Sequence, residues 1–339
     1  MGADRGGGAG RLAAVRATLS EMARLFLGVD GGQSSTTALV GDENGRVLGL
    51  GQDGPCNHVS GPGARDKFIG AIGGAVKKAS EQAGLAASHR DFAAACCGFS
   101  GGPQDKRPLI EEMFSIGHLE VTHDGLIALV GANAGRPGII AIAGTGQLAF
   151  GRNASGLTAR AGGWGYVYGD EGGGFDLTRQ ALRSALRMEE GWGPDTTLRA
   201  ALLAASGAQD ANDLLHRFYT VDWPRPKIAA MSKLVDDAAI AGDAVAIDLL
   251  HLAAQHQANF VGAVRSQLFS EGEPARVAYI GGVFGSIRLR ERFRRLVELA
   301  DGVTCGPPEM GPAAGALIEA YRLCGVSVTL TNVPRVEKR

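Results

Sequence analysis

The sequence predicts an α/β protein of two lobes, each opening on a three-strand antiparallel meander. Residues 26–49 read FLGVDGGQSSTTALVGDENGRVLG, and residues 139–162 read IIAIAGTGQLAFGRNASGLTARAG. Both stretches alternate apolar residues and contain two glycine-bearing turns, a pattern typical of hairpins. Such turns present backbone N–H groups that no Cβ obstructs, so two of them, one per lobe, can clamp a polyphosphate from opposite sides. The repeat therefore indicates an ATP-using enzyme.

Helical and strand patterns alternate after each meander. In the first lobe we expect helices at 63–84, 104–114 and 125–134 and strands at 92–97 and 119–122. In the second lobe we expect a helix at 172–188, several helices up to 270, a strand at 276–280, a helix at 286–299, a short strand at 303–305 and a closing helix at 312–323. Antiparallel strands followed by β-α units are the mixed order of a ribonuclease-H-like lobe. The predicted class is α/β, with two ribonuclease-H-like lobes and a cleft between them.

These patterns divide the chain into four parts. Residues 1–24, rich in Gly, Ala and Arg, are expected to be a disordered tail; a targeting segment, or a natural start at Met22, are the alternatives. The N-terminal lobe is expected at 25–125 and the C-terminal lobe at 126–325, leaving open that helix 312–323 packs back on the first lobe. Residues 326–339 are expected to be a C-terminal tail.

Composition narrows the class of protein. The chain has 339 residues, 45% of them hydrophobic and 20% charged, with a formal net charge of −1. No basic excess favours nucleic acid or an anionic membrane as a partner, and the apolar runs are strand-sized rather than membrane-spanning. The five cysteines lack C-x-x-C spacing, so neither a disulfide framework nor a zinc site is indicated. We expect a cytoplasmic protein, and a homodimer is possible.

The first glycine turn is the first candidate phosphate site. Asp30 ends the first strand, and an acidic residue beside phosphate-binding amides would hold Mg²⁺, through water. The alternative is a hairpin turn with Asp30 as its cap. The second glycine turn, at 144–146, favours phosphate binding. The candidate nucleotide contacts of the first turn are Gly31, Gly32, Gln33, Ser34, Ser35 and Thr36.

A third glycine pair, Gly281-Gly282, follows the strand expected at 276–280 and precedes a helix. A nucleotide held at two phosphate turns needs a further contact for its adenosine end, and this turn lets the backbone approach closely. The alternative is a tight strand-to-helix turn.

Asp124 also follows a strand and precedes a helix, where a carboxylate can accept the hydroxyl proton in a kinase reaction. Its alternative is a helix N-cap.

Two loops are candidates for sugar contacts. Residues 162–172, GGWGYVYGDEG, combine aromatic rings, glycines including Gly165, and the carboxylate of Asp170. Rings pack on the apolar face of a sugar, and carboxylates accept hydrogen bonds from its hydroxyls. Helix capping by the carboxylates would leave so many glycines unexplained. In the loop around Asn57 and His58, the amide can read a hydroxyl, while His58 is better explained as a loop brace.

A serine hydrolase is the rival enzyme class. Residues 98–102, GFSGG, match the G-x-S-x-G nucleophile elbow around Ser100. Chance matches are frequent with 52 glycines, and no HGGG-type oxyanion segment precedes this one. The elbow reading also leaves both meanders unexplained.

The ordered series DGGQSST, CNH, HDG, AGTGQ, GGWGYVYGDEGG, GGVFGS and PPEMGPAAGA resembles the BadF/BadG/BcrA/BcrD ATPase family, and within it the N-acetylglucosamine kinases of the actin-like and sugar-kinase superfamily. The resemblance covers nearly everything from 25 to 323. It places Gly31 to Thr36, Gly144, Gly146, Gly281 and Gly282 at nucleotide positions. It places Asn57, Asp124, Thr145 and Asp170 at sugar-contacting positions, with Asp124 as the base, and Gly165 in the substrate loop.

The resemblance implies ATP- and Mg²⁺-dependent phosphorylation of an amino sugar, most simply N-acetylglucosamine or glucosamine, at the 6-hydroxyl. A sugar-sensing protein without catalysis is the alternative from another class. Pro103 stands where eukaryotic relatives carry an acidic residue after Ser-Gly-Gly, which changes the loop near the sugar. The cluster-binding cysteines of the iron–sulfur activators in the wider family have no counterpart here, which argues against that role.

Overall fold

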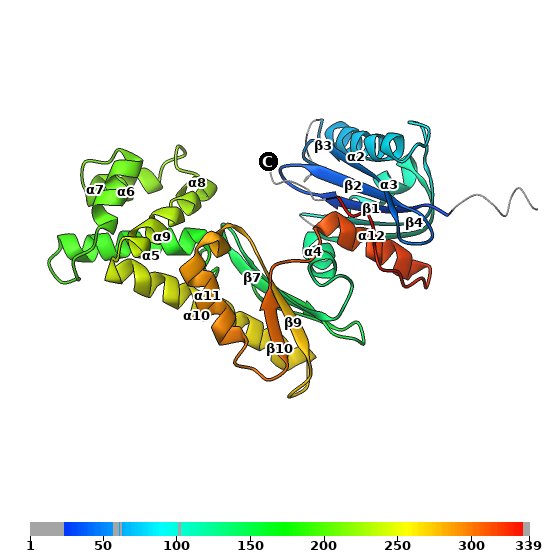
Figure 1. The fold of residues 1–339 in the computed structure, drawn as a ribbon. Helices are drawn as coiled ribbons and strands as arrows, with labels where there is room; N and C mark the ends of the chain where they lie inside the picture. The colour runs from blue at the N-terminus through cyan, green and yellow to red at the C-terminus, as the bar shows by residue number, and fades with distance from the viewer. Residues whose placement is uncertain (1–23, 57–60, 62, 101–102, 335–339) are drawn as a thin grey trace, which may run out of the picture. The chain divides into compact units, whose positions relative to one another are not determined.

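The computed structural model describes residues 24–334, apart from 57–60, 62 and 101–102. The chain divides into two compact units (Figure 1). Unit 1 comprises Met1–Ile127 and Pro312–Arg339, and unit 2 comprises Ala128–Gly311. The expected tail 1–24 lies outside the described residues except for Arg24.

Unit 1 is built on a five-stranded mixed sheet in the order β3-β2-β1-β4-β5. Its first three strands form the antiparallel meander expected from the glycine turns, and β4 and β5 run parallel to β1. The carboxyl ends of β1, β4 and β5 therefore meet at one edge of the sheet. The strands are β1 (Phe26–Gly31), β2 (Thr36–Gly41), β3 (Val47–Asp53), β4 (Asp91–Phe99) and β5 (Ser115–His123).

Helices cover both faces of this sheet (Figure 1). On one face α2 (Ala64–Gln82) packs on β3 and β2, close enough that a Cβ at Gly51 would stand 1.9 Å from the Ala75 carbonyl oxygen. On the other face α12 (Pro312–Leu323) packs on β1 and β4, and a Cβ at Gly28 would stand 2.3 Å from the Leu317 nitrogen. Glycines thus let both helices touch the strand backbones. Two shorter helices are α3 (Arg107–Met113) and α4 (Asp124–Ala132), which crosses the unit boundary.

The end of the described chain also belongs to unit 1. Residues 326–334 were expected to be a tail, but they lie against the turn between β2 and β3. The Val47 N–H donates to the Thr331 carbonyl at 3.0 Å, and the Thr331 N–H donates to the Gly45 carbonyl at 3.0 Å. Leu330 is buried. These two backbone bonds give the segment a fixed path along the sheet edge.

Unit 2 repeats the sheet of unit 1. Its order is β10-β9-β6-β7-β8. If the five strands of each unit are numbered 1 to 5 along the chain, both sheets have the order 5-4-1-2-3. The meander β6-β7-β8 is antiparallel, while β9 and β10 continue parallel to β6. The predicted class, α/β with two ribonuclease-H-like sheets, is confirmed. The strands are β6 (Gly138–Ala143), β7 (Gln147–Arg152), β8 (Thr158–Gly162), β9 (Ala275–Ile280) and β10 (Val303–Gly306).

Helices make up most of unit 2 between β8 and β9. The long helix α10 packs on β6, β7 and β8, and α11 packs on α10 and on β10. Within the described parts of the chain, no helix combines the length and the apolar character needed to span a bilayer. The helices are α5 (Gly174–Glu189), α6 (Leu198–Ser206), α7 (Ala211–Phe218), α8 (Arg225–Ala230), α9 (Ser232–Ile240), α10 (Ala244–Leu268) and α11 (Ile287–Val297), with a 3₁₀ turn η1 (Gly282–Gly285).

Candidate functional site

Two carboxylates gather at the carboxyl edge of the unit 1 sheet. Asp30 lies in β1, and Asp124 begins α4 directly after β5. The Ser100 hydroxyl, just after β4, donates to Asp124 Oδ2 at 2.7 Å, and the Gly125 N–H donates to Asp124 Oδ1 at 2.8 Å. Asp124 is solvent-exposed, so its carboxylate is oriented by these donors yet open to a ligand. This position is compatible both with a helix N-cap and with a general base.

Asp30 has an unusual charge environment. Burial, reinforced by the negative charge of Asp124, raises the pKa of Asp30 from 3.8 to about 6. No described residue donates a hydrogen bond to its carboxylate. A divalent cation would offset both the burial cost and the repulsion, and carboxylate oxygen is the ligand type that Mg²⁺ prefers. The residues present therefore fit Mg²⁺, although no described group of three or more His, Cys, Asp or Glu side chains forms a metal cage by itself.

The first glycine turn presents only part of its expected donors. Gln33, Ser34 and Ser35 are exposed, and the Gly32 N–H closes the turn on the Ser35 carbonyl at 3.0 Å. Thr36 differs from the expectation: its side chain is buried, and its hydroxyl lies 2.8 Å from the Gly54 carbonyl and 3.0 Å from Cys56 Sγ. Thr36 therefore ties the turn to the loop that follows β3, and its hydroxyl hydrogen is donated there rather than to a phosphate. The predicted sugar contact Asn57, like His58, lies outside the described residues.

Unit 2 brings its two glycine turns together. Because β6 and β9 are parallel neighbours, the turn at 144–146 and the pair Gly281-Gly282 emerge at the same sheet edge. Gly281 has φ 114°, and a Cβ there would stand 2.2 Å from the Ala143 carbonyl oxygen, so only glycine fits. The Phe175 N–H, in the first turn of α5, donates to the Thr145 carbonyl at 3.1 Å, which fixes the turn against that helix. The side of Gly144 that a Cβ would occupy is open space.

A small pocket adjoins Gly282. It has a volume of about 300 Å³ and lies between α9 and the start of α11. The Ser286 hydroxyl caps α11 by accepting from the Leu289 N–H at 3.3 Å, and it donates to Asp236 of α9. This link fixes the two helices around the pocket, which we call the Gly282 pocket. Its other lining residues are Leu177, Ser232, Lys233, Asp237, Leu250, Val283 and Gly285.

Asp170 is buried in unit 2 rather than open in its loop. Its residue is 4% exposed, it pairs with Arg225, and its Oδ1 accepts from the Gln147 N–H at 3.3 Å. A Cβ at Gly146 would stand 2.5 Å from Asp170 Oδ2, so the carboxylate lies directly behind the glycine turn. Asp170 therefore supports the turn at 144–146, whatever ligand it also contacts. Gly165, with φ 80°, faces open space in the same loop.

An aromatic cavity of about 570 Å³ begins beside this ion pair. The Arg225 guanidinium lies 5.0 Å from the ring centre of Tyr166 and 5.9 Å from that of Phe175. Arg179 also lines the cavity, held by Asp176 at 2.6 Å. Rings and hydrogen-bonding side chains of this kind suit a sugar derivative. The remaining lining residues are Val167, Leu182, Leu215, Phe218, Tyr219, Trp223 and Ile228.

Three residues at the site were not among the candidate residues predicted from the sequence. Arg225 pairs with Asp170, which lies 55 positions earlier in the chain, and nothing in the segment around Arg225 indicates this partner. Gln147 is 3% exposed, and both polar atoms of its side-chain amide lack a partner among the described residues. Lys106 has a side chain only 1% exposed, bonded to Asp105 Oδ1 at 2.9 Å and placed near the Phe99 ring. Gln147 and Lys106 are buried and Arg225 is partly buried, and these contacts depend on packing that the sequence does not display.

The hydrolase alternative is not supported by the surroundings of Ser100. Its hydroxyl donates to the carboxylate of Asp124 rather than to an imidazole. A nucleophile elbow leads straight from strand into helix, but here the next helix, α3, begins only at Arg107. Ser100 is therefore better described as a partner of Asp124 than as a nucleophile.

Two ribonuclease-H-like units with glycine turns at their sheet edges define the class of actin-like ATPase folds. The chain belongs to the BadF/BadG/BcrA/BcrD ATPase family, whose profile matches residues 27–320. The resemblance inferred from the sequence motifs is thereby confirmed.

Three relatives show what the chain is similar to. It is 31% identical over 283 residues to the N-acetylmuramic acid/N-acetylglucosamine kinase of Clostridium acetobutylicum, covering 81% of this chain and 91% of the relative. It is 28% identical to the N-acetyl-D-glucosamine kinase of Dictyostelium discoideum, covering 76% of this chain and 85% of the relative. A solved structure from Chromobacterium violaceum, assigned by inference as an N-acetylglucosamine kinase, superimposes with a TM-score of 0.66 at 27% identity, covering 87% of this chain and 98% of that one.

Proposed function

We propose that this protein transfers the terminal phosphoryl group of ATP to the 6-hydroxyl of an amino sugar, N-acetylglucosamine in the first place, with glucosamine and N-acetylmuramic acid as the close alternatives. The observation that carries the proposal is the exposed carboxylate of Asp124, oriented by Ser100 at the sheet edge that also carries Asp30. The acceptor class is supported by the names of the two relatives above.

Each residue at the unit 1 sheet edge has a role in this proposal. Asp124 accepts the proton of the sugar hydroxyl as that oxygen attacks phosphorus. Ser100 is a positioning residue, because its hydrogen bond fixes the carboxylate rotamer. Asp30 holds Mg²⁺, which when bound neutralises charge on the phosphate oxygens. The exposed turn residues Gln33 to Ser35 offer donors to phosphate. Asn57, which lies outside the described residues, is assigned to the sugar by the resemblance alone.

Unit 2 supplies the remaining contacts in the proposal. The turn at 144–146 binds phosphate through its backbone, with Thr145 also near the acceptor, and the Gly282 pocket takes the adenosine end. Asp170, Gly165 and the aromatic cavity contact the sugar and its substituents. Because Asp170 also supports the turn, its role toward the sugar is tested with Asn, which keeps the size of the side chain.

The test is a turnover assay with a panel of sugars. Phosphorylation of N-acetylglucosamine, glucosamine, N-acetylmuramic acid and glucose is followed by phosphorus NMR with ATP and Mg²⁺. Asp124→Asn should lower kcat by about 10² to 10⁴, as expected for a lost general base, with sugar affinity largely retained. Asp91→Asn, at the amino end of β4, is the matched control, and its kcat should equal that of the parent.

Two results would overturn the proposal. Sugar binding without turnover of ATP for any member of the panel would identify a sugar sensor. Normal turnover in Asp124→Asn would remove that residue from the chemistry, and Asp105 would be the next carboxylate to substitute.

A further inference from the structure

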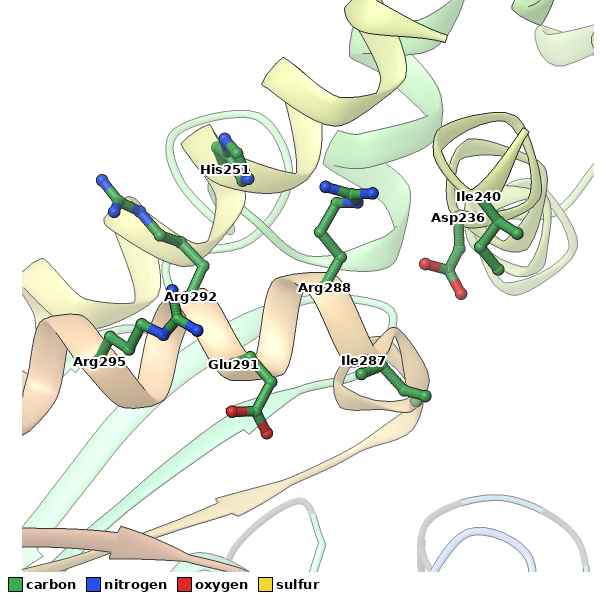
Figure 2. Close-up of a pocket in the computed structure, with 9 residues that line it drawn as sticks. Asp236, Ile240, His251, Ile287, Arg288, Glu291, Arg292 and Arg295 are labelled. Carbon is green, nitrogen blue, oxygen red and sulfur yellow. The ribbon is translucent and has the colours of Figure 1, made fainter. Parts of the chain in front are cut away.

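Unit 2 carries a third hollow, which the proposed reaction does not use. It has a volume of about 550 Å³ and lies along α10 and α11 (Figure 2). Arg288, Arg292 and Arg295 of α11 line it together with His251 of α10. We call these four residues and the hollow between them the arginine groove.

The three arginines share one face of their helix. Positions 288, 292 and 295 are spaced i, i+4 and i+7, which places their side chains in one row along α11. In Figure 2, Arg288 and Arg292 extend from α11 toward the helix that carries His251, while the carboxylate of Glu291 points away from that helix. Arg292 lies at i+4 from Arg288 and i−3 from Arg295, spacings at which like charges repel each other.

Their neighbours on α11 behave differently. Arg294 pairs with Glu298 at 3.1 Å, and Arg290 donates to the Phe284 carbonyl at 3.1 Å. Arg288, Arg292 and Arg295 make no ion pair or hydrogen bond with any other residue that the structure describes. The helix therefore uses two of its arginines for structure and leaves three facing one concave surface.

The wall of the groove also contains two carboxylates, but neither pairs with these arginines. Asp236 accepts the Ser286 hydroxyl, and Glu291 makes no ion pair with a described residue. Three guanidinium groups against two carboxylates leave the groove positive, in a chain whose formal net charge is −1. The positive charge is thus local and does not reflect a basic protein.

We propose that the arginine groove binds a small phosphate monoester at a site separate from the nucleotide site. The planar donor fork of a guanidinium matches phosphate oxygens, and the hollow falls in the range of about 300 to 1,000 Å³ typical of small-ligand sites. Ile240 and Ile287, which are 74% and 66% exposed, add apolar surface for the organic part of the ester. Binding of the ester does not depend on the kinase reaction, whereas its separation from the nucleotide site rests on the proposed function.

The position of the groove connects it to the Gly282 pocket. Both are lined by Asp236 and Gly285, and Asp236 is bonded to the residue that caps α11. An anion bound to the row of arginines contacts α11, the helix whose start borders the Gly282 pocket. Occupation of the groove is therefore expected to change nucleotide affinity, and the reverse effect must be equal.

Calorimetric titration tests the proposal. Glucose 6-phosphate and AMP are the probes, each titrated with the Gly282 pocket saturated by a non-hydrolysable ATP analogue. We expect one of them to bind saturably, and which one binds tells whether the ester is a sugar phosphate or a nucleotide. Arg292→Gln should weaken binding by about tenfold, since it removes a charge-assisted hydrogen bond, and added salt should weaken it further.

Arg294→Gln is the matched control, because it removes the same charge from the same helix outside the groove. It should leave probe affinity within about twofold, as an exposed pair contributes little. The proposal is overturned if neither probe binds, if both variants lose affinity equally, or if the ATP analogue displaces the probe. Arg292-dependent binding of a DNA duplex or an anionic vesicle, without binding of either probe, would also overturn it, since the surface would then serve a macromolecular polyanion.

Discussion

Replacing Asp30 by Asn should stabilise the protein in a pH-dependent way. The rise of the Asp30 pKa from 3.8 to about 6 is equivalent to a folding cost of about 3 kcal/mol when the carboxyl is ionised. Below pH 3.8 the carboxyl is protonated in both the folded and the unfolded chain, and this cost is absent. As pH rises toward and through about 6, the folded carboxyl must also ionise, and the stability that its protonated form contributed is lost.

The variant carries no ionisable group at this position, so it escapes that loss. At pH 8 and without divalent metal, Asp30→Asn should be more stable than the parent by an amount approaching about 3 kcal/mol, and at pH 4.5 by much less. Urea unfolding at both pH values measures the difference, and hydrogen exchange in β1 peptides reports on unit 1 separately. Asp91→Asn is the control, because that residue is exposed at the other end of the sheet.

Magnesium and nucleotide should reverse the ranking. A ligand that binds only the folded state stabilises it by mass action, so Mg²⁺ with an ATP analogue should stabilise the parent more than the variant. A variant that is less stable at pH 8, or a difference that does not change with pH, would refute the charge argument. An equal effect of Mg²⁺ on both proteins would refute the metal assignment alone.

Three further substitutions test other parts of the site and fold. Ser100→Ala should lower kcat with little change in KM, and Ser100→Thr should restore it; loss of fold in the alanine variant would point to a structural role instead. Asp170→Asn, which tolerates the φ of 64° at that position, should raise the sugar KM while nucleotide affinity, titrated separately, changes little. Equal loss for both ligands would make Asp170 a support of the glycine turn only. Gly28→Ala should lower the stability of unit 1 by about 3 kcal/mol or more in urea, since its Cβ would overlap the backbone at Leu317; an unchanged midpoint would contradict the packing.

The sequence predicted the meanders well because glycine turns and alternation are local signals. β1 to β3 and β6 to β8 lie where the apolar alternation placed them, and the closing helix occurs at Pro312–Leu323 as expected. The carboxylates Asp30 and Asp124 could be assigned to one sheet edge for a related reason. Each directly follows or ends a strand, and parallel strands bring their carboxyl ends together.

Other features depend on contacts between distant segments and had no local signal. Thr36 occurs in a hydroxyl-rich turn that looks suited to phosphate, yet packing turns it inward onto Cys56. Asp170 occurs in a flexible-looking glycine loop, yet it is buried by Arg225, which follows 55 positions later. Thr331 likewise forms a parallel β-bridge with Arg46, and no sequence pattern near Thr331 indicates this partner.

The two sheets repeat each other, but the charge at their glycine turns differs, and this difference supports the roles that we propose for them. By strand register Gly31 corresponds to Ala143, so the position of Asp30 corresponds in unit 2 to the apolar Ile142. The carboxylate nearest the second turn is Asp170, and Arg225 already neutralises it. The turn of unit 2 thus offers backbone amides without a free acid, which suits an anionic phosphate. The edge of unit 1 carries two acids in mutual repulsion, which suits a cation and an acceptor proton.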